Sequence, residues 1–225
     1  AELTPARERL RSGEITFRKG GTLLLRDSAE GVVTNMKAIA TEQVGPYSFK
    51  FIAGEFFQNN PHVLPKMVGY ALEQAKAPGV KHLVDAYCGV GVFAICGHES
   101  FEQVAGIEVS ERAVELAREN ARINKVDNVE FHFGSAEAIF EGLSFPSEET
   151  TVLMDPPRKG SDERFLRQLL DFGPRRIVYV SCGPDTQARD LRLLTDGLYQ
   201  VVDVQPVDLF PQTRHIENIV TLDRI

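Results

Sequence analysis

Residues 61–225 alternate between short apolar runs and segments of helical periodicity, and this alternation limits the fold more than any other feature. We expect strands at residues 82–87, 104–109, 129–133, 151–155, 176–182, near 200–204 and at 218–222. We expect helices at residues 111–125, 163–172 and 186–197. Ser110 is a suitable N-cap for the first helix, and Gly197 is a suitable C-terminal glycine for the last. The order predicts an α/β, Rossmann-like domain with a seven-stranded, mostly parallel sheet.

The first 60 residues have a different pattern. GGTLLLRDSAEGVVT, KAIATEQVG and YSFKFIAG are typical of short strands separated by turns that contain glycine. We therefore predict a small β-rich piece at residues 1–60, followed by the Rossmann-like domain at residues 61–225.

Composition limits the partners of the chain. With 225 residues and 43% hydrophobic content, it can bury a core of ordinary size. The net charge of -7 argues against binding nucleic acid over the whole surface, so any RNA contact is expected to be local. Two groups of basic residues are candidates, although solvated helix and strand edges explain them equally simply. They are Arg7, Arg9, Arg11, Arg18, Lys19 and Arg26, and Arg158, Lys159, Arg164 and Arg167.

Neither a membrane span nor a signal peptide is visible in the sequence. No run approaches roughly 20 apolar residues, and the N-terminal residues lack a basic region followed by an apolar one. Cys88, Cys96 and Cys182 are widely spaced and odd in number, which fits neither a disulfide framework nor a metal site. We expect an intracellular protein that has no membrane partner and no metal. The oligomeric state stays open.

A glycine loop, DAYCGVGVF, joins a predicted strand to a helix. Gly89 and Gly91 allow a ligand to approach the backbone closely, and Glu108 ends the next strand, where a carboxylate accepts hydrogen bonds from ribose. The pattern favours S-adenosylmethionine. A nicotinamide or flavin nucleotide stays possible because Ala94 occupies the third small position, and a structural turn is the remaining alternative.

The motif DPPRKG follows the fourth predicted strand. The carboxyl ends of parallel strands open onto the ligand crevice, so Asp155 is expected there. Methyltransferases that act on amino groups use a related loop that ends in an aromatic residue. Arg158 stands at that position here, which favours a ring carbon as the acceptor. The alternative is a strand that ends in prolines, followed by a solvated Arg-Lys pair.

Two further motifs follow later strands. Cys182 lies at a predicted strand end beside a helix N-terminus, which favours a nucleophilic thiolate, although free cysteines are often buried packing residues. Cys88 and Cys96 are expected to be packing residues. Glu217 lies in the apolar context of HIEN, where burial raises a carboxyl pKa toward a useful value for a base. His215 is either a second base or a hydrogen-bonded spacer.

The segment EFFQNNP connects the β-rich piece to the Rossmann-like part. Phe56 or Phe57 can stack on a base, and Gln58 can contact its edge or the cofactor. Core packing is the alternative for the two phenylalanines.

Together, FFQNNP, DAYCGVGVF, IEV, DPPRKG, SCGP and HIEN occur in the order seen in the uracil-C5 RNA methyltransferases. Over essentially its whole length the chain resembles the catalytic part of a tRNA (uracil-5-)-methyltransferase of the eukaryotic, fungal type. The resemblance implies the class I S-adenosylmethionine-dependent methyltransferase fold, methylation of uridine C5 in RNA, most simply tRNA, and product S-adenosylhomocysteine. It assigns Gln58, Tyr87, Glu108 and Asp155 to the cofactor, Cys182 as nucleophile, Glu217 as proton acceptor, and Phe56 and Arg158 to the target uridine.

The chain departs from the family pattern in two ways. The usual S-C-N-P is Ser181-Cys182-Gly183-Pro184 here, so the support of an asparagine side chain is missing. The N-terminal RNA-binding module and the cysteines that bind an iron-sulfur cluster in some members are not in this sequence, so no cluster is expected. Alternatives are a cytosine-C5 RNA methyltransferase, which normally uses two cysteines, an inactive RNA-binding factor that keeps the fold, and a nicotinamide oxidoreductase.

Overall fold

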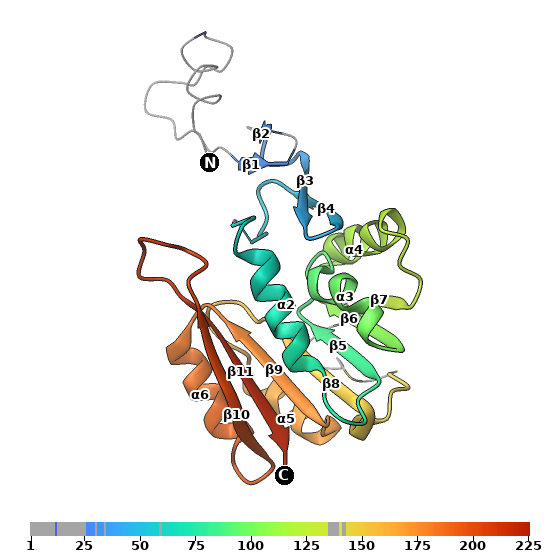
Figure 1. Cartoon of the computed structure of the whole chain (residues 1–225), viewed down its shortest axis with the longest axis vertical. Coiled ribbons are helices and arrows are strands. Elements are labelled where there is room, and N and C mark those ends of the chain that lie inside the picture. The colour runs from blue at the N-terminus through green and yellow to red at the C-terminus, as the bar shows by residue number, and fades with distance from the viewer. Residues whose placement is uncertain are drawn as a thin grey trace.

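The computed structural model describes residues 12, 26–29, 31–33, 35–58, 60–134, 140 and 143–225. Its centre is a seven-stranded sheet in the order β10-β11-β9-β8-β5-β6-β7 (Figure 1). The strands are β5 (His82–Ala86), β6 (Gln103–Glu108), β7 (Val129–Phe133), β8 (Thr150–Met154), β9 (Arg176–Ser181), β10 (Tyr199–Val207) and β11 (Glu217–Arg224). The predicted mostly parallel α/β fold is confirmed.

Strand direction brings distant segments to one edge of this sheet. β5, β6, β7, β8 and β9 are parallel, so their carboxyl ends share that edge. β11 runs antiparallel to β9, and Asn218 pairs with Ser181. The first residue of β11, Glu217, therefore lies at the same edge as Cys182, which follows β9.

Helices cover both faces of the sheet (Figure 1). Alternate strand residues belong to separate cores, so that Leu83 packs on one face and Val84 on the other. The first face carries α2 (Leu64–Ala75), α3 (Val92–Gly97) and α4 (Glu111–Ile123), and the second carries α5 (Glu163–Phe172) and α6 (Pro184–Leu194). Two short 3-10 turns, η1 (His98–Ser100) and η2 (Ser147–Glu149), complete the connections.

Side-chain caps mark the N-termini of α4 and α5. The Ser110 hydroxyl accepts from the backbone N–H of Ala113 at 3.3 Å, which confirms the predicted N-cap of α4. The predicted closure of the last helix at Gly197 is wrong, because α6 ends at Leu194 and is capped by Thr195. Gly197 instead has φ 89 in the following turn.

In the described part of the chain, two hairpins precede α2. β1 (Arg26–Ser28) pairs with β2 (Gly31–Val33), and β3 (Ile39–Val44) pairs with β4 (Tyr47–Ile52), as the turn pattern predicted. The division at residue 60 stays a prediction. The basic residues Arg7, Arg9, Arg11, Arg18 and Lys19 lie outside the described residues. Within the described ranges, no helix is long and apolar enough to cross a membrane.

Candidate active site

The glycine loop leaves β5 at the ligand edge of the sheet. Gly91 has φ 89, and a Cβ there would lie 2.7 Å from the Phe131 ring, so only glycine fits the turn that starts α3. Gly89 has φ 53, and a Cβ there would meet no atom within 4 Å. One glycine thus closes the turn on the core, and the other faces open space through which a ligand can approach.

Glu108 lies at the end of β6 beside this loop. Its carboxylate accepts from the backbone N–H groups of Gly89 at 3.0 Å, Val109 at 2.8 Å and Ser110 at 2.9 Å. A carboxylate has about four acceptor positions, so it can hold the loop and still accept from a ligand hydroxyl. The contact between Glu108 and the glycine loop supports the predicted pairing of these two motifs.

Asp85 is a buried acid at the base of the loop that the sequence reasoning left out of the site. It is fully buried, and Oδ2 accepts from the backbone N–H of Ala94 at 2.9 Å, whereas Oδ1 has no hydrogen-bond partner. Burial, with a smaller contribution from the charge of Glu108, raises its pKa to about 8. Asp85 could have been found from the sequence as an acidic residue inside a buried strand, just before a glycine loop.

Tyr87 follows β5 in a strained conformation with φ 65. Its ring lies 5.0 Å from that of Phe165, and its hydroxyl is 3.4 Å from Ser161 Oγ. Burial raises the Tyr87 pKa to about 12, so the side chain stays a neutral hydrogen-bonding group. The left-handed backbone turns the chain from the strand into the glycine loop.

The two phenylalanines of the segment before α2 differ in burial. Phe57 is buried and stacks on Phe51 at 4.4 Å, whereas the Phe56 side chain is 75% exposed. Gln58 hydrogen-bonds to the Asp155 side chain, and its Oε1 is buried without a partner. The core alternative therefore holds for Phe57, while Phe56 is free to contact a ligand.

Cys182 is partly buried between β9 and α6, where the strand pattern placed it. The predicted preference for thiolate is wrong for the isolated protein. Burial raises the pKa of the Cys182 thiol, and the negative charges of Glu217 and Asp155 raise it further. Arg158 acts in the opposite direction. Burial is the largest of these causes, and the two carboxyls come from segments before and after Cys182 in the sequence.

Glu217 is 1% exposed, and its Oε2 has no hydrogen-bond partner. Burial raises the pKa of this carboxyl to about 7, as its apolar context predicted. The Asp155 pKa is also raised well above its usual range, because the group is buried and close to Glu217. The site therefore holds two neighbouring carboxyls that readily keep a proton.

Arg158 connects three loops around Cys182. Its Nη2 lies 3.1 Å from Nδ1 of His215, so these two side chains are within hydrogen-bond distance. Its carbonyl oxygen accepts from the Thr186 hydroxyl at 3.1 Å, and the same hydroxyl lies 2.8 Å from the Gly183 oxygen. The hydroxyl of Thr186 thus links the DPPRKG loop to the cysteine loop.

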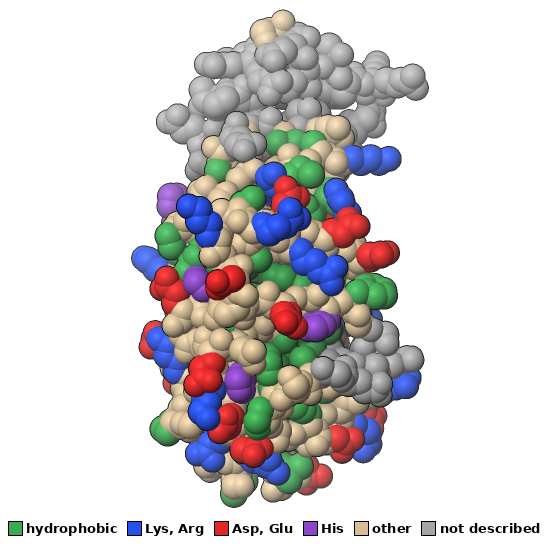
Figure 2. Space-filling view, turned by 90° about the vertical axis from the view of Figure 1, so that its right-hand side faces the viewer, with side chains coloured by type: hydrophobic (Ala, Val, Ile, Leu, Met, Phe, Trp, Pro, Cys, Tyr) green, Lys and Arg blue, Asp and Glu red, His purple; other side chains and the backbone are tan. Residues whose placement is uncertain are grey.

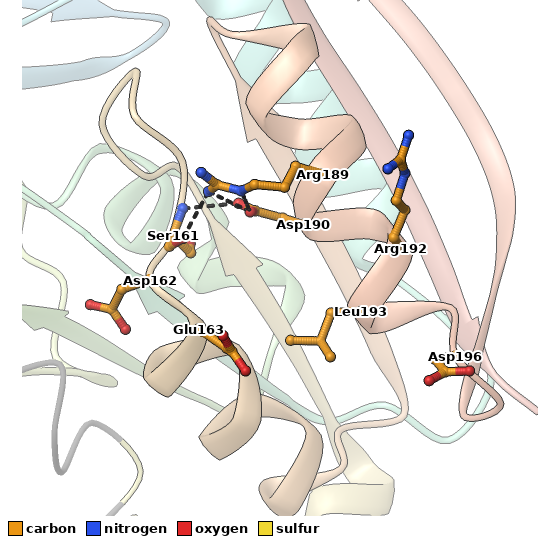
Figure 3. A pocket seen from close by; sticks show the side chains of 8 residues that line it. All are labelled: Ser161, Asp162, Glu163, Arg189, Asp190, Arg192, Leu193 and Asp196. Atoms are coloured by element: carbon orange, nitrogen blue, oxygen red, sulfur yellow. Dashed lines mark hydrogen bonds and ion pairs between the residues drawn. The ribbon is translucent and has the colours of Figure 1, made fainter.

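A separate cleft of about 590 Å³ lies between α5 and α6 (Figure 3). The Asp190 carboxylate lies in its wall and accepts hydrogen bonds from the Ser161 N–H at 2.9 Å and the Tyr179 hydroxyl at 2.7 Å. It also forms an ion pair with Arg189 at 2.6 Å. Its central charge is therefore satisfied within the protein, and its lining residues include none of the predicted site residues. The bond from Ser161 to Asp190 holds the end of the DPPRKG loop against α6.

The surface carries charges of both signs. On the face shown in Figure 2, Lys and Arg side chains are interspersed with Asp and Glu. Ion pairs among the described residues include Lys50 with Glu119 at 2.7 Å and Arg112 with Glu115 at 2.6 Å. Intermixed charge agrees with the expectation that any RNA contact is local. Among the described residues, no group of three or more His, Cys, Asp or Glu side chains is placed to hold a metal.

Residues 32–225 match the family model described as tRNA (Uracil-5-)-methyltransferase. The chain belongs to this family. The match includes every site residue named above and removes the nicotinamide oxidoreductase alternative.

Relatives in the tRNA (uracil-5-)-methyltransferase family agree with this assignment. The chain is 44% identical over 97% of its length to tRNA (uracil(54)-C(5))-methyltransferase of Schizosaccharomyces pombe, and covers 44% of that protein. It is 40% identical over 100% of its length to the Saccharomyces cerevisiae protein of the same name, covering 37% of it. The chain therefore spans less than half the length of these relatives.

A solved structure of a family member shares the fold. It is the Pyrococcus abyssi tRNA (uracil-54, C5)-methyltransferase in complex with S-adenosyl-L-homocysteine, with a TM-score of 0.71 and 31% identity. The alignment covers 85% of this chain and 45% of that one.

Proposed function

We propose that this chain transfers a methyl group from S-adenosylmethionine to C5 of a uridine in RNA, with tRNA as the RNA. The observation that carries the proposal is the placement of the Cys182 thiol beside the Glu217 and Asp155 carboxyls, at the sheet edge that holds the glycine loop. Family membership and the similar P. abyssi protein, solved with S-adenosyl-L-homocysteine, support it.

The residues at this edge fit an adenosyl cofactor. Buried oxygens of Gln58 and Asp85 have no partner within the protein, and Asp155 lies nearby. A ligand that carries ammonium and sulfonium charges would favour the ionised form of these buried carboxyls, so the two can pair. Residues proposed to hold the cofactor are Gln58, Tyr87, Gly89, Glu108 and Asp155, with Asp85 added. When bound, S-adenosylmethionine supplies a methyl group on a positively charged sulfur, and the sulfur is the leaving group when an electron-rich carbon takes the methyl.

Cys182 makes C5 of uracil electron-rich by covalent catalysis. After the thiol has lost its proton to water, Sγ forms a bond to C6, and the electron pair of the C5–C6 double bond moves onto C5 and O4 as an enolate. The positive charge of Arg158 favours the thiolate. A cofactor with positive charge adds to this effect, because it stabilises every anion at the edge.

Glu217 completes the reaction as a base. Once C5 carries the methyl group, the carboxylate takes the C5 proton. The electrons of that C–H bond restore the C5–C6 double bond, and the bond between C6 and Sγ breaks to release the thiolate. A carboxyl with a pKa of about 7 is ionised in about half of the molecules at neutral pH and is basic enough to accept the proton.

The target uridine must leave its base stack to reach a sheet edge, which costs a few kcal/mol. Phe56 is proposed to stack on the extruded base, because its ring is 75% exposed. Arg158 is proposed to hold the uridine or its phosphate, since its guanidinium lies at the same edge as the thiol.

The proposal is tested by incubating the purified chain with unmodified tRNA and isotopically labelled S-adenosylmethionine, followed by mass spectrometry of the nucleosides. We expect labelled 5-methyluridine with wild type and with Cys96→Ala, and none with Cys182→Ala. Methylation by Cys182→Ala at the wild-type rate refutes the mechanism. Labelled 5-methylcytidine supports the cytosine-C5 alternative, and tRNA binding without any transfer supports the inactive-factor alternative.

A further inference from the structure

Two asparagines, Asn120 in α4 and Asn124 at its C-cap, hold the β3–β4 hairpin. Oδ1 of Asn120 accepts from the Lys50 N–H at 2.8 Å, and its Nδ2 donates to the Lys50 oxygen at 3.1 Å. One helical turn later, Oδ1 of Asn124 accepts from the Ser48 N–H at 2.9 Å, and its Nδ2 donates to the Ser48 oxygen at 2.7 Å. Each amide therefore makes the pair of bonds that a residue of a neighbouring strand would make.

The spacing of these contacts explains why two asparagines suffice. Residues at i and i+4 share one face of a helix, and alternate strand residues point their N–H and C=O groups to the same side. β3 pairs with β4 on the other side, so Ser48 and Lys50 present the free edge of the hairpin to α4. The side-chain amides supply the hydrogen-bond partners for the N–H and C=O groups of that edge.

Asn120 has one additional contact that Asn124 lacks. It is fully buried, and its Nδ2 also donates to the Val90 oxygen at 3.0 Å. Val90 lies between Gly89 and Gly91 in the glycine loop. Both N–H groups and the oxygen of this amide are thus used, two bonds to the hairpin and one to the loop. The second N–H of Asn124 donates only to the Asn120 backbone oxygen, at 2.8 Å.

We propose that Asn120 is a positioning residue that fixes the glycine loop through its bond to the Val90 oxygen, so that it contributes to cofactor affinity without touching the cofactor. This inference rests on the proposed function, because the glycine loop is taken as the cofactor loop. A loop held by its carbonyl is preorganised, and preorganisation raises affinity by lowering the entropy lost on binding.

The test compares Asn120→Ala with Asn124→Ala, since both remove two bonds to the hairpin and only the first removes the bond to Val90. Binding of S-adenosylhomocysteine is measured by calorimetry, and unfolding by urea gives the stability of each variant. We expect both variants to lose stability to a similar extent. The dissociation constant should rise about fivefold in Asn120→Ala, the factor expected for one lost hydrogen bond, and stay within twofold of wild type in Asn124→Ala.

Asn120→Asp is the second variant if Asn120→Ala does not fold, because it keeps the acceptor for Lys50 and loses the N–H donors, at the cost of a buried carboxyl. Hydrogen exchange of residues 85–93 provides a readout without ligand, and should accelerate in the Asn120 variants alone. Equal affinities and equal loop exchange in the Asn120 and Asn124 variants overturn the inference. If wild type binds no S-adenosylhomocysteine, the proposed function fails instead, and the cofactor role of Asn120 fails with it.

Discussion

Replacing Glu217 by glutamine should change the pH dependence of stability in a defined direction. Burial raises the Glu217 pKa from 4.5 to about 7 in the folded protein. Between these values the unfolded chain releases the proton and the folded chain keeps it, so stability falls as pH rises. The stability lost by pH 8 is about 3 kcal/mol, at about 1.4 kcal/mol for each pH unit between the two pKa values. Glutamine never ionises, so it removes this loss.

Urea unfolding of wild type and Glu217→Gln at several pH values between 5 and 8 measures the effect. The stability of the variant relative to wild type should increase by about 2.5 kcal/mol between pH 5 and pH 8. Glu130→Gln, which removes an exposed carboxylate, controls for the changed net charge. A difference between wild type and Glu217→Gln that does not vary with pH would refute the burial argument.

The same ionisation should control the reaction, because only the carboxylate can accept the C5 proton. The single-turnover rate of wild type should rise about tenfold between pH 6 and pH 8, and the raised pKa of Cys182 should steepen the rise. A rate that is flat over this range would show that Glu217 is not the base.

Phe56→Ala should weaken RNA binding by about tenfold, a value expected for one lost base stack, without lowering the melting temperature, as measured by fluorescence anisotropy and calorimetry. Phe57→Ala should do the reverse and cost about 3 kcal/mol of stability, because that ring is buried against Phe51; equal effects of both variants on RNA binding would contradict the separation. Gly183→Ala should slow methylation about tenfold, because the new Cβ would lie 2.9 Å from the Arg158 oxygen and displace the loop. Gly69→Ala, where a Cβ meets nothing within 4 Å, is the control for Gly183→Ala and should be active.

The fold was predictable because the strands are buried apolar runs with clear ends. β7 and α5 have the predicted boundaries, and the motif positions at strand ends followed from strand direction. Helix α2 was not predicted, although Leu64, Met67, Val68 and Ala71 recur at helical spacing. Gly69 lowers helix propensity there, and packing of α2 on the sheet supplies the missing stability.

The site was only partly predictable, because electrostatics depends on which distant residues become neighbours. The thiol of Cys182 was located from its strand, but the two carboxyls that raise its pKa come from segments before and after it. Asp85 and Asn120 were missed for the same reason. The role of Asp85 depends on its unpaired oxygen, and that of Asn120 depends on its contact with Val90. The order of residues in the sequence reveals neither.

Trapping the covalent adduct is the most direct test of the central claim that the Cys182 thiol attacks an extruded uridine. A tRNA that contains 5-fluorouridine has no C5 proton for Glu217 to remove, so the bond between Sγ and C6 cannot be broken by elimination. With S-adenosylmethionine present, wild type should form a protein-RNA complex that survives denaturing electrophoresis, and digestion should place the nucleotide on residue 182. Formation of the same complex by Cys182→Ala, or its absence with a wild-type protein that methylates normal tRNA, would contradict the account.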